Sequence, residues 1–164
     1  MKILHLLILF LISLCIISCQ EKDLFKSPIC DFSKGVDHVL SEESNELIDD
    51  DGENQTYAPN TVGSVYKIRK LKYKGKTSNS QEYTIDYTFM KDKLFSVSIV
   101  IPNIQIEEVE NYLSKNYSLV ENKYFCDFTK SVAIITGIQE DENGAFILYY
   151  DNNEVFQFVL QRYQ

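Results

Sequence analysis

Hydrophobic and polar residues alternate along much of the chain after residue 64, and this alternation is typical of half-buried strands. The clearest case is a predicted hairpin over residues 82–101, in which a tight turn at Lys91-Asp92-Lys93 separates two alternating runs. Its odd positions predict one buried face: Tyr83, Ile85, Tyr87, Phe89, Phe95, Val97, Ile99 and Ile101. We expect strands near 64–74, 82–90, 94–101, 119–128, 131–139, 145–151 and 154–162, with further turns at Asn143-Gly144 and Asp151-Asn152-Asn153.

One segment, about 104–115, has helical periodicity. Its apolar stripe and margin are formed by Ile106, Val109, Leu113, Tyr112 and Tyr117. Pro102 ends the preceding strand, and Asn103 is expected to cap the helix through its side-chain oxygen. The order strands, helix, strands predicts an α+β domain: one mostly antiparallel β-sheet of about six or seven strands with a single helix packed on one face. The opposite face would be solvated or covered by the N-terminal arm or a partner.

The first eighteen residues have the outline of a secretory signal peptide. One early lysine, Lys2, precedes an apolar run from Ile3 to Ile17 and the small residue Ser18. A transmembrane anchor is the alternative. However, the fifteen residues of this run, at about 1.5 Å each, fall short of a hydrocarbon core of roughly 30 Å. We therefore expect residues 1–18 to be a signal peptide that is removed.

The end of this segment, Ile16-Ile17-Ser18-Cys19, resembles the lipobox of bacterial lipoproteins. In that family an aliphatic and a small residue precede a cysteine that is diacylated and becomes the mature N-terminus. The resemblance covers residues 1–19 and implies lipidation of Cys19, which would hold the chain on a membrane because two or three acyl chains anchor stably. Gln20, in place of Asp, implies the outer membrane. The run Glu21-Lys22-Asp23 is similar to surface-export tags of some Gram-negative lipoproteins.

The net charge of −8 is concentrated in the N-terminal part of the mature chain. Residues 20–60 carry eleven acids against three lysines, whereas residues 61–164 carry twelve basic and thirteen acidic side chains. This division predicts a lipidated N-terminal tether and acidic loop over 19–63, with a short helix near Val36 and Val39, and a globular domain over 64–164. The charge also argues against a nucleic-acid partner, because binding nucleic acid takes a basic surface.

The acidic run Asp49-Asp50-Asp51-Gly52-Glu53-Asn54 invites comparison with a calcium loop. With Gly52 at the sixth position of an EF-hand loop, Leu47 and Ala58 occupy the first and twelfth positions, where carboxylates are needed. We therefore expect a solvated loop and no metal site.

The four cysteines divide into two pairs by position. Cys15 lies in the expected signal peptide and Cys19 would carry lipid, which leaves Cys30 and Cys126 in an oxidising compartment. One disulfide between them is favoured, and in the chain-entropy model it would stabilise the fold by roughly 4 to 5 kcal/mol. Two separate buried thiols that behave as small hydrophobes are the alternative.

Six basic residues without an intervening acid are the sharpest local feature: Lys67, Arg69, Lys70, Lys72, Lys74 and Lys76. On a strand, the four even-numbered lysines share one face. They would either protect an exposed edge strand from aggregation or form a contact for anionic lipid headgroups, lipopolysaccharide phosphates or an acidic partner. Eleven tyrosines similarly suit either contact surfaces or simple strand preference.

The sequence offers little support for catalysis. His38 is the one histidine of the mature chain, and serine-hydrolase, paired-histidine and phosphate-loop patterns are missing. Carboxylate pairs such as Glu107 with Glu110, or Glu121 with Asp127, are more commonly solvated than catalytic.

The predicted function is a membrane-anchored, non-enzymatic binding, adaptor or inhibitory (immunity-like) module at the cell envelope. It would have no cofactor beyond the lipid on Cys19, and its partner would be another envelope or secreted protein. A structural accessory subunit of an outer-membrane assembly is the first alternative. An enzyme with an unrecognised carboxylate site is the second.

Overall fold

A computed structural model describes residues 23–52, 55–57, 66–120, 123–126, 131–137 and 144–151. In chain order the described elements are α2 (Val36–Glu42), β1 (Glu46–Asp50), β2 (Gln55–Tyr57), β3 (Tyr66–Lys76), β4 (Glu82–Met90), β5 (Lys93–Pro102), α3 (Ile106–Asn116), β6 (Ser118–Val120), β7 (Lys123–Cys126), β8 (Ser131–Gly137) and β9 (Gly144–Asp151).

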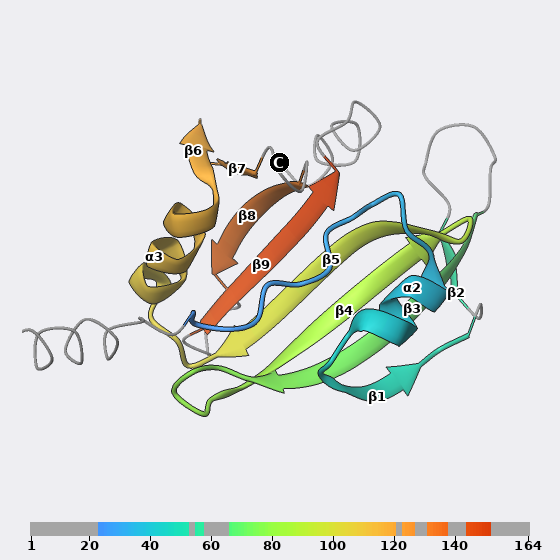
Figure 1. The fold of residues 1–164 in the computed structure, drawn as a ribbon, viewed down its shortest axis with the longest axis horizontal. Coiled ribbons are helices and arrows are strands. Elements are labelled where there is room, and N and C mark those ends of the chain that lie inside the picture. The colour runs from blue at the N-terminus through green and yellow to red at the C-terminus, as the bar shows by residue number, and fades with distance from the viewer. Residues whose placement is uncertain are drawn as a thin grey trace, which may run out of the picture.

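The strands form one sheet in the order β1-β3-β4-β5-β9-β8-β7-β6, with β2 also paired to β3 (Figure 1). Every pairing between the described strands is antiparallel. The predicted α+β class with a mostly antiparallel sheet is therefore confirmed.

The expected six or seven strands and single helix differ in number from the structure, since the described residues form nine strands and a second helix, α2, at the position of the short helix expected near Val36 and Val39. Two extra strands, β1 and β2, form in the acidic segment that was expected to be a solvated loop. The predicted strand 119–128 is instead a hairpin, in which Val120 pairs with Lys123. The predicted strand 154–162 and the turns at Asn143-Gly144 and Asp151-Asn152-Asn153 involve residues outside the described part of the chain.

The hairpin of β4 and β5 forms largely as its alternation predicts. Lys91 and Asp92 both have positive φ, 52° and 59°, as in a two-residue turn of type I′. The expected burial of Phe95 is wrong, because the register shifts at Phe89 and pairs it with Leu94. Leu94 is therefore buried in place of Phe95, and the alternation of buried odd positions resumes at Val97.

The main helix, α3, buries the predicted stripe with Val109, Tyr112 and Leu113. Its expected cap is wrong. The residue before the helix is Gln105, which makes no side-chain capping hydrogen bond, while Asn103 adopts a φ of 56° in the connection from β5. Asn103 tolerates this left-handed conformation better than most residues, so it serves the turn instead of the helix.

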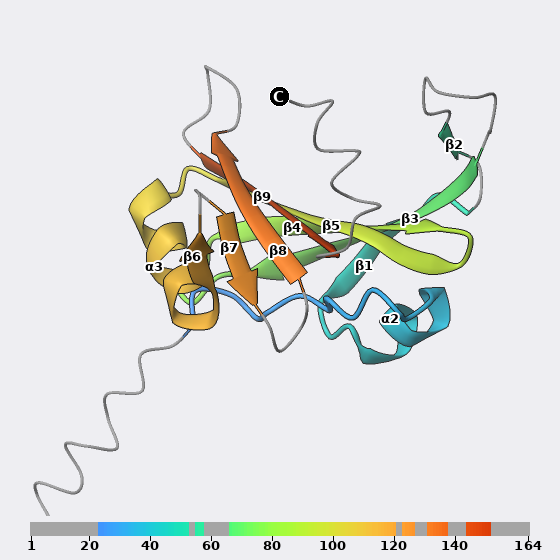
Figure 2. The same ribbon diagram turned by 90° about the horizontal axis from the view of Figure 1, so that it is seen from above.

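Residues 23–35, which we call the N-terminal strap, run across the same face of the sheet as α2 and α3 (Figure 2). At one end of the strap, Ser78 N–H donates to the Leu24 carbonyl at 2.8 Å; at the other, Leu94 N–H donates to the Lys34 carbonyl at 2.8 Å. Between these two contacts the strap also makes a turn, in which Lys34 N–H donates to the Asp31 carbonyl at 3.0 Å. The strap thus crosses the sheet from the turn between β3 and β4 to the start of β5.

The strap contributes side chains to the core, although its residues were expected to be tether. Phe25 is 2% exposed, and its ring centroid lies 4.3 Å from that of Tyr112 and 5.6 Å from that of Tyr83. Cys30 is also buried there. Residues from 24 onward therefore pack with the residues that were assigned to the globular domain.

Polar contacts hold the strap over a layer of buried tyrosines. The Ser27 and Tyr112 hydroxyls lie 2.8 Å apart, and Ile29 N–H donates to the Tyr87 hydroxyl at 3.2 Å. The Tyr87 hydroxyl in turn donates to a carboxylate oxygen of Glu43, just beyond α2. Burial raises the pKa of Tyr112 to about 12, so the hydroxyl stays protonated and available for hydrogen bonding.

We predict that Phe25→Ala lowers the free energy of unfolding by about 3 kcal/mol, because it removes a large buried ring from the core. Leu47→Ala, at a side chain 43% exposed on β1, is the matched control and should cost less than about 1 kcal/mol. Urea denaturation of the mature domain measures both changes. Equal, small effects would mean that the strap is a loose tether in solution.

Candidate functional site

The structure places six basic residues on β3, an interior strand of the sheet. We call them the basic row: Lys67, Arg69, Lys70, Lys72, Lys74 and Lys76. Strand β3 pairs with β4 on one side and with β1 and β2 on the other. The interpretation of β3 as an exposed edge protected by lysines is therefore wrong. The described edge strand on this side is β1, which is short, acidic and bulged near Ile48, features that discourage pairing with another chain.

The even-numbered lysines do share one face, as predicted. Leu71 and Tyr73, between them, are buried on the opposite face. We call the lysine-bearing side, which faces away from the strap and the helices, the outer face.

Acids on β4 lie beside two of these lysines. Lys74 Nζ is 2.9 Å from a carboxylate oxygen of Glu82, and Lys72 Nζ is 3.9 Å from one of Asp86. Asp49 and Glu46 of β1 are register partners of Lys72 and Lys74 on the other side. The row is therefore part of a ladder of alternating charge across three strands, in which exposed pairs each contribute little to stability.

Arg69 belongs to a separate cluster at the end of β1 and near the start of β3. Its Nε and Nη2 donate to the two carboxylate oxygens of Asp50, at 2.9 and 2.6 Å. This bidentate pairing is the first cause that lowers the pKa of the Asp50 carboxyl, and the Gly52 N–H adds a further donor. The Asp51 carboxylate accepts from the Lys70 N–H at 2.7 Å.

Asp86 is the half-buried acid of the ladder. Burial is the largest influence on it and raises the pKa of its carboxyl, although Lys72 and Lys70 act in the opposite direction. Of the basic residues, Lys67 and Lys76 are the most exposed. The contact with an anionic ligand thus stays a prediction. The positive charge of the basic row is partly offset at Lys72 and Lys74, which lie beside acids.

The outer face changes character from strand to strand. Beyond the lysines of β3, β4 presents Thr84, Asp86 and Thr88, and β5 presents Ser96 and Ser98. The next strand, β9, adds the half-buried Phe146 and Leu148 and the buried Tyr150. Charged, hydroxyl-bearing and apolar side chains thus follow one another across this face.

The structure bears only partly on the predicted cysteine chemistry. Cys19 lies outside the described residues. Cys30 belongs to the strap and is buried in the core. Cys126 ends β7 opposite Ser131, and its side chain is outside the described part. The disulfide stays a prediction.

Other predicted site residues do not converge. The carboxylates of Glu107 and Glu110 are exposed on α3, and His38 lies on α2, whereas Glu121 and Asp127 are outside the described residues. No group of metal-ligating side chains occurs within the described ranges, and none of the helices described there is long and apolar enough to cross a membrane.

Sequence reasoning missed the contact between Glu43 and Tyr87 and the covering role of the strap. The clustering of Leu24, Phe25, Ile29 and Phe32 in a segment otherwise assigned to solvent was the available signal.

Comparison with known proteins shows no family for this chain. No family model and no solved structure matches it. A stretch of 62 residues is 32% identical to viral late gene transcription factor 3 of fowlpox virus (strain NVSL). The match covers 38% of this chain and 28% of that protein. It therefore spans little more than a quarter of the relative and assigns no function.

For the disulfide, we predict that the mature protein, denatured without reductant, reacts with no thiol reagent at Cys30 or Cys126. After reduction both should be labelled, because a bridge in an oxidising compartment protects both sulfurs until it is broken. Peptide mass spectrometry with differential alkylation distinguishes the two states. Labelling of both cysteines before reduction would establish the alternative of two separate thiols.

Proposed function

We propose that this protein is a lipoprotein of the cell envelope, anchored in the outer membrane through acyl chains on Cys19. It acts there as a non-enzymatic binding, adaptor or inhibitory module for another envelope or secreted protein. The observation that carries the proposal is the sequence Ile16-Ile17-Ser18-Cys19, placed immediately before a chain that packs from Leu24 onward.

The arrangement of the sheet supports the outer face as the contact surface. The other face is occupied by the strap, α2 and α3, which bury their apolar side chains in a shared core. On the outer face the partly exposed Ser96 and Ser98 lie between a charged region and the partly exposed Phe146 and Leu148, while Tyr150, opposite Ser96, is buried. Protein interfaces combine an apolar centre with a polar rim in a similar way.

The anchor is tested by Cys19→Ser. We predict loss of palmitate incorporation and of sedimentation with membranes, because the thiol is the site of acylation and without acyl chains the domain has no stable anchor. Cys15→Ser, in the segment expected to be removed, is the control and should leave both unchanged. Radiolabelled palmitate and fractionation of expressing bacteria provide the measurement, and an unaltered Cys19→Ser protein would refute the anchor.

The contact surface is tested by Ser98→Arg, which places a long charged side chain in the middle of the outer face. We predict loss of the partner that wild-type protein retains after affinity capture from detergent-solubilised membranes, because the added bulk prevents close packing. Asn79→Arg, at an exposed turn, is the control and should retain that partner. Equal recovery with both variants, each checked for a wild-type thermal melt, would exclude the outer face.

A further inference from the structure

The described domain begins very close to the proposed lipid anchor. Leu24 is the fifth residue after Cys19, and its carbonyl is fixed to Ser78 by the 2.8 Å hydrogen bond from Ser78 N–H. The next residue, Phe25, is buried in the core. Five residues span at most about 18 Å even when fully extended, so this point of the domain cannot move further than that from the acylated cysteine.

The attachment point lies at one defined end of the sheet. Ser78 belongs to the turn between β3 and β4, residues 77–81, and the Gln81 side chain donates to the Pro102 carbonyl at the end of β5. We call this end of the molecule, formed by residues 77–81 and 102–105, the anchor end.

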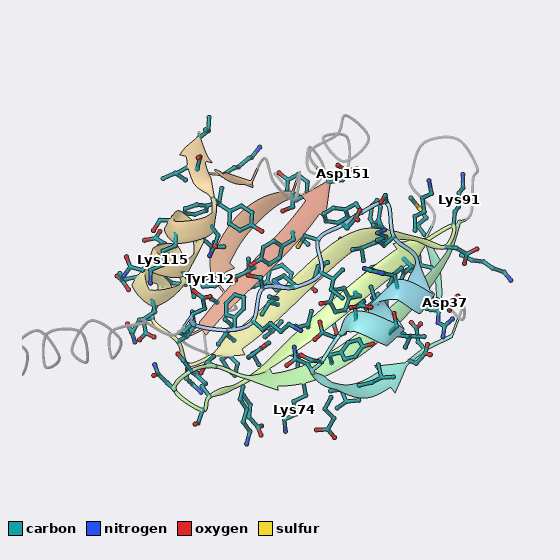
Figure 3. The ribbon with its side chains drawn as sticks, in the orientation of Figure 1. Asp37, Lys74, Lys91, Tyr112, Lys115 and Asp151 are labelled. Atoms are coloured by element: carbon teal, nitrogen blue, oxygen red, sulfur yellow. The ribbon has the colours of Figure 1, made fainter. Side chains whose placement is uncertain are left out.

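The distal end lies at the other end of the same strands, at the turn Lys91-Asp92. There the strap finishes against β5, where an added Cβ on Gly35 would lie only 2.7 Å from the Asp92 carbonyl oxygen. Figure 3 shows Lys91 and Asp37 at this end, away from Tyr112. The nine residues of β4 separate the two ends by about 30 Å.

We propose that the domain is oriented on the membrane, with its anchor end towards the lipid headgroups and the turn Lys91-Asp92 away from them. This inference rests on the proposed lipidation of Cys19. A tether shorter than the domain permits tilting but prevents inversion, because the anchor end stays within about 18 Å of the surface. The outer face then extends from the anchor end away from the bilayer, and the distal end projects furthest from it.

The orientation changes what the basic row can do. Because β3 runs from the distal end to the anchor end, the row extends away from the bilayer instead of lying along it. Lys76 is closest to the lipid, and Lys67 is furthest from it. At the anchor end the charge of Lys74 is offset by Glu82, whereas Lys76 is exposed, and we assign the orientation to the covalent tether.

The test uses the full-length, lipidated protein in vesicles of zwitterionic phosphatidylcholine that contain acceptor-labelled lipid. A donor fluorophore is attached through an azide-bearing residue that replaces either Asn79 or Asp92, so that the native cysteines are left intact. We expect clearly stronger energy transfer from position 79 than from position 92, because position 79 lies up to about 30 Å nearer the lipid. Raised salt should leave this difference unchanged.

A matched variant carries an insertion of about ten Gly and Ser residues between Gln20 and Glu21, which frees the domain to turn over and should reduce the difference. Equal transfer from both positions of the wild-type tether, or stronger transfer from position 92, would overturn the orientation. A difference seen only when anionic lipid is added to the vesicles, and abolished by salt, would also overturn it, in favour of contact through the lysines. Vesicle flotation separates the two proposals, because failure to float refutes the anchor itself and the orientation with it.

Discussion

The packing of the N-terminal strap against the tyrosine-rich face of the sheet is the contact on which the rest of the structure depends. An antiparallel sheet must bury one face against a second layer. The longest described helix, α3, has eleven residues and a length of about 16 Å, roughly half that of the central strands. The strap and α2 cover the part of this sheet face that α3 does not reach. The strap also supplies hydrogen-bond partners for the Tyr87 and Tyr112 hydroxyls.

The same contact gives the two sides of the sheet different properties. On the covered side, tyrosines that suit contact surfaces are core residues instead: Tyr73, Tyr83, Tyr87, Tyr112 and Tyr149 are all buried. On the outer face, lysines of β3 are held between acids of β1 and β4, and the surface becomes less charged towards β9. The proposed binding by the outer face would therefore use a different side of the sheet from the one that packs the core.

Those parts of the fold that depend on local pattern could be predicted from the sequence. The hairpin of β4 and β5, the shared face of the even-numbered lysines and the stripe of α3 all follow from residue spacing. The position of β3 inside the sheet could not be predicted, because it depends on pairing with an acidic segment that has no strand alternation. The burial of Leu94 in place of Phe95 depends on a β-bulge, and no residue pattern in the sequence indicates that bulge.

The packing of the strap on the sheet could not be predicted from the sequence for a related reason. An extended segment that crosses a sheet has neither the helical nor the strand period, so its apolar residues look like a tether with a few hydrophobic side chains. Of the candidate site, the placement of the basic residues on one strand was predictable, whereas their pairing with Asp86 and Glu82 required the register of β3 and β4. The lipidation of Cys19 remains a prediction from sequence.

Native-state hydrogen exchange of the mature domain tests the central contact most directly. The amides of Ile29, Ser78 and Leu94 each donate across the boundary between the strap and the tyrosine layer or the strand ends. If the strap is part of the cooperative fold, these amides exchange only through openings about as costly as those that expose the amides of β4. Exchange of Ile29 and Leu94 at the rate of an unstructured chain, while β4 stays protected, would contradict the account.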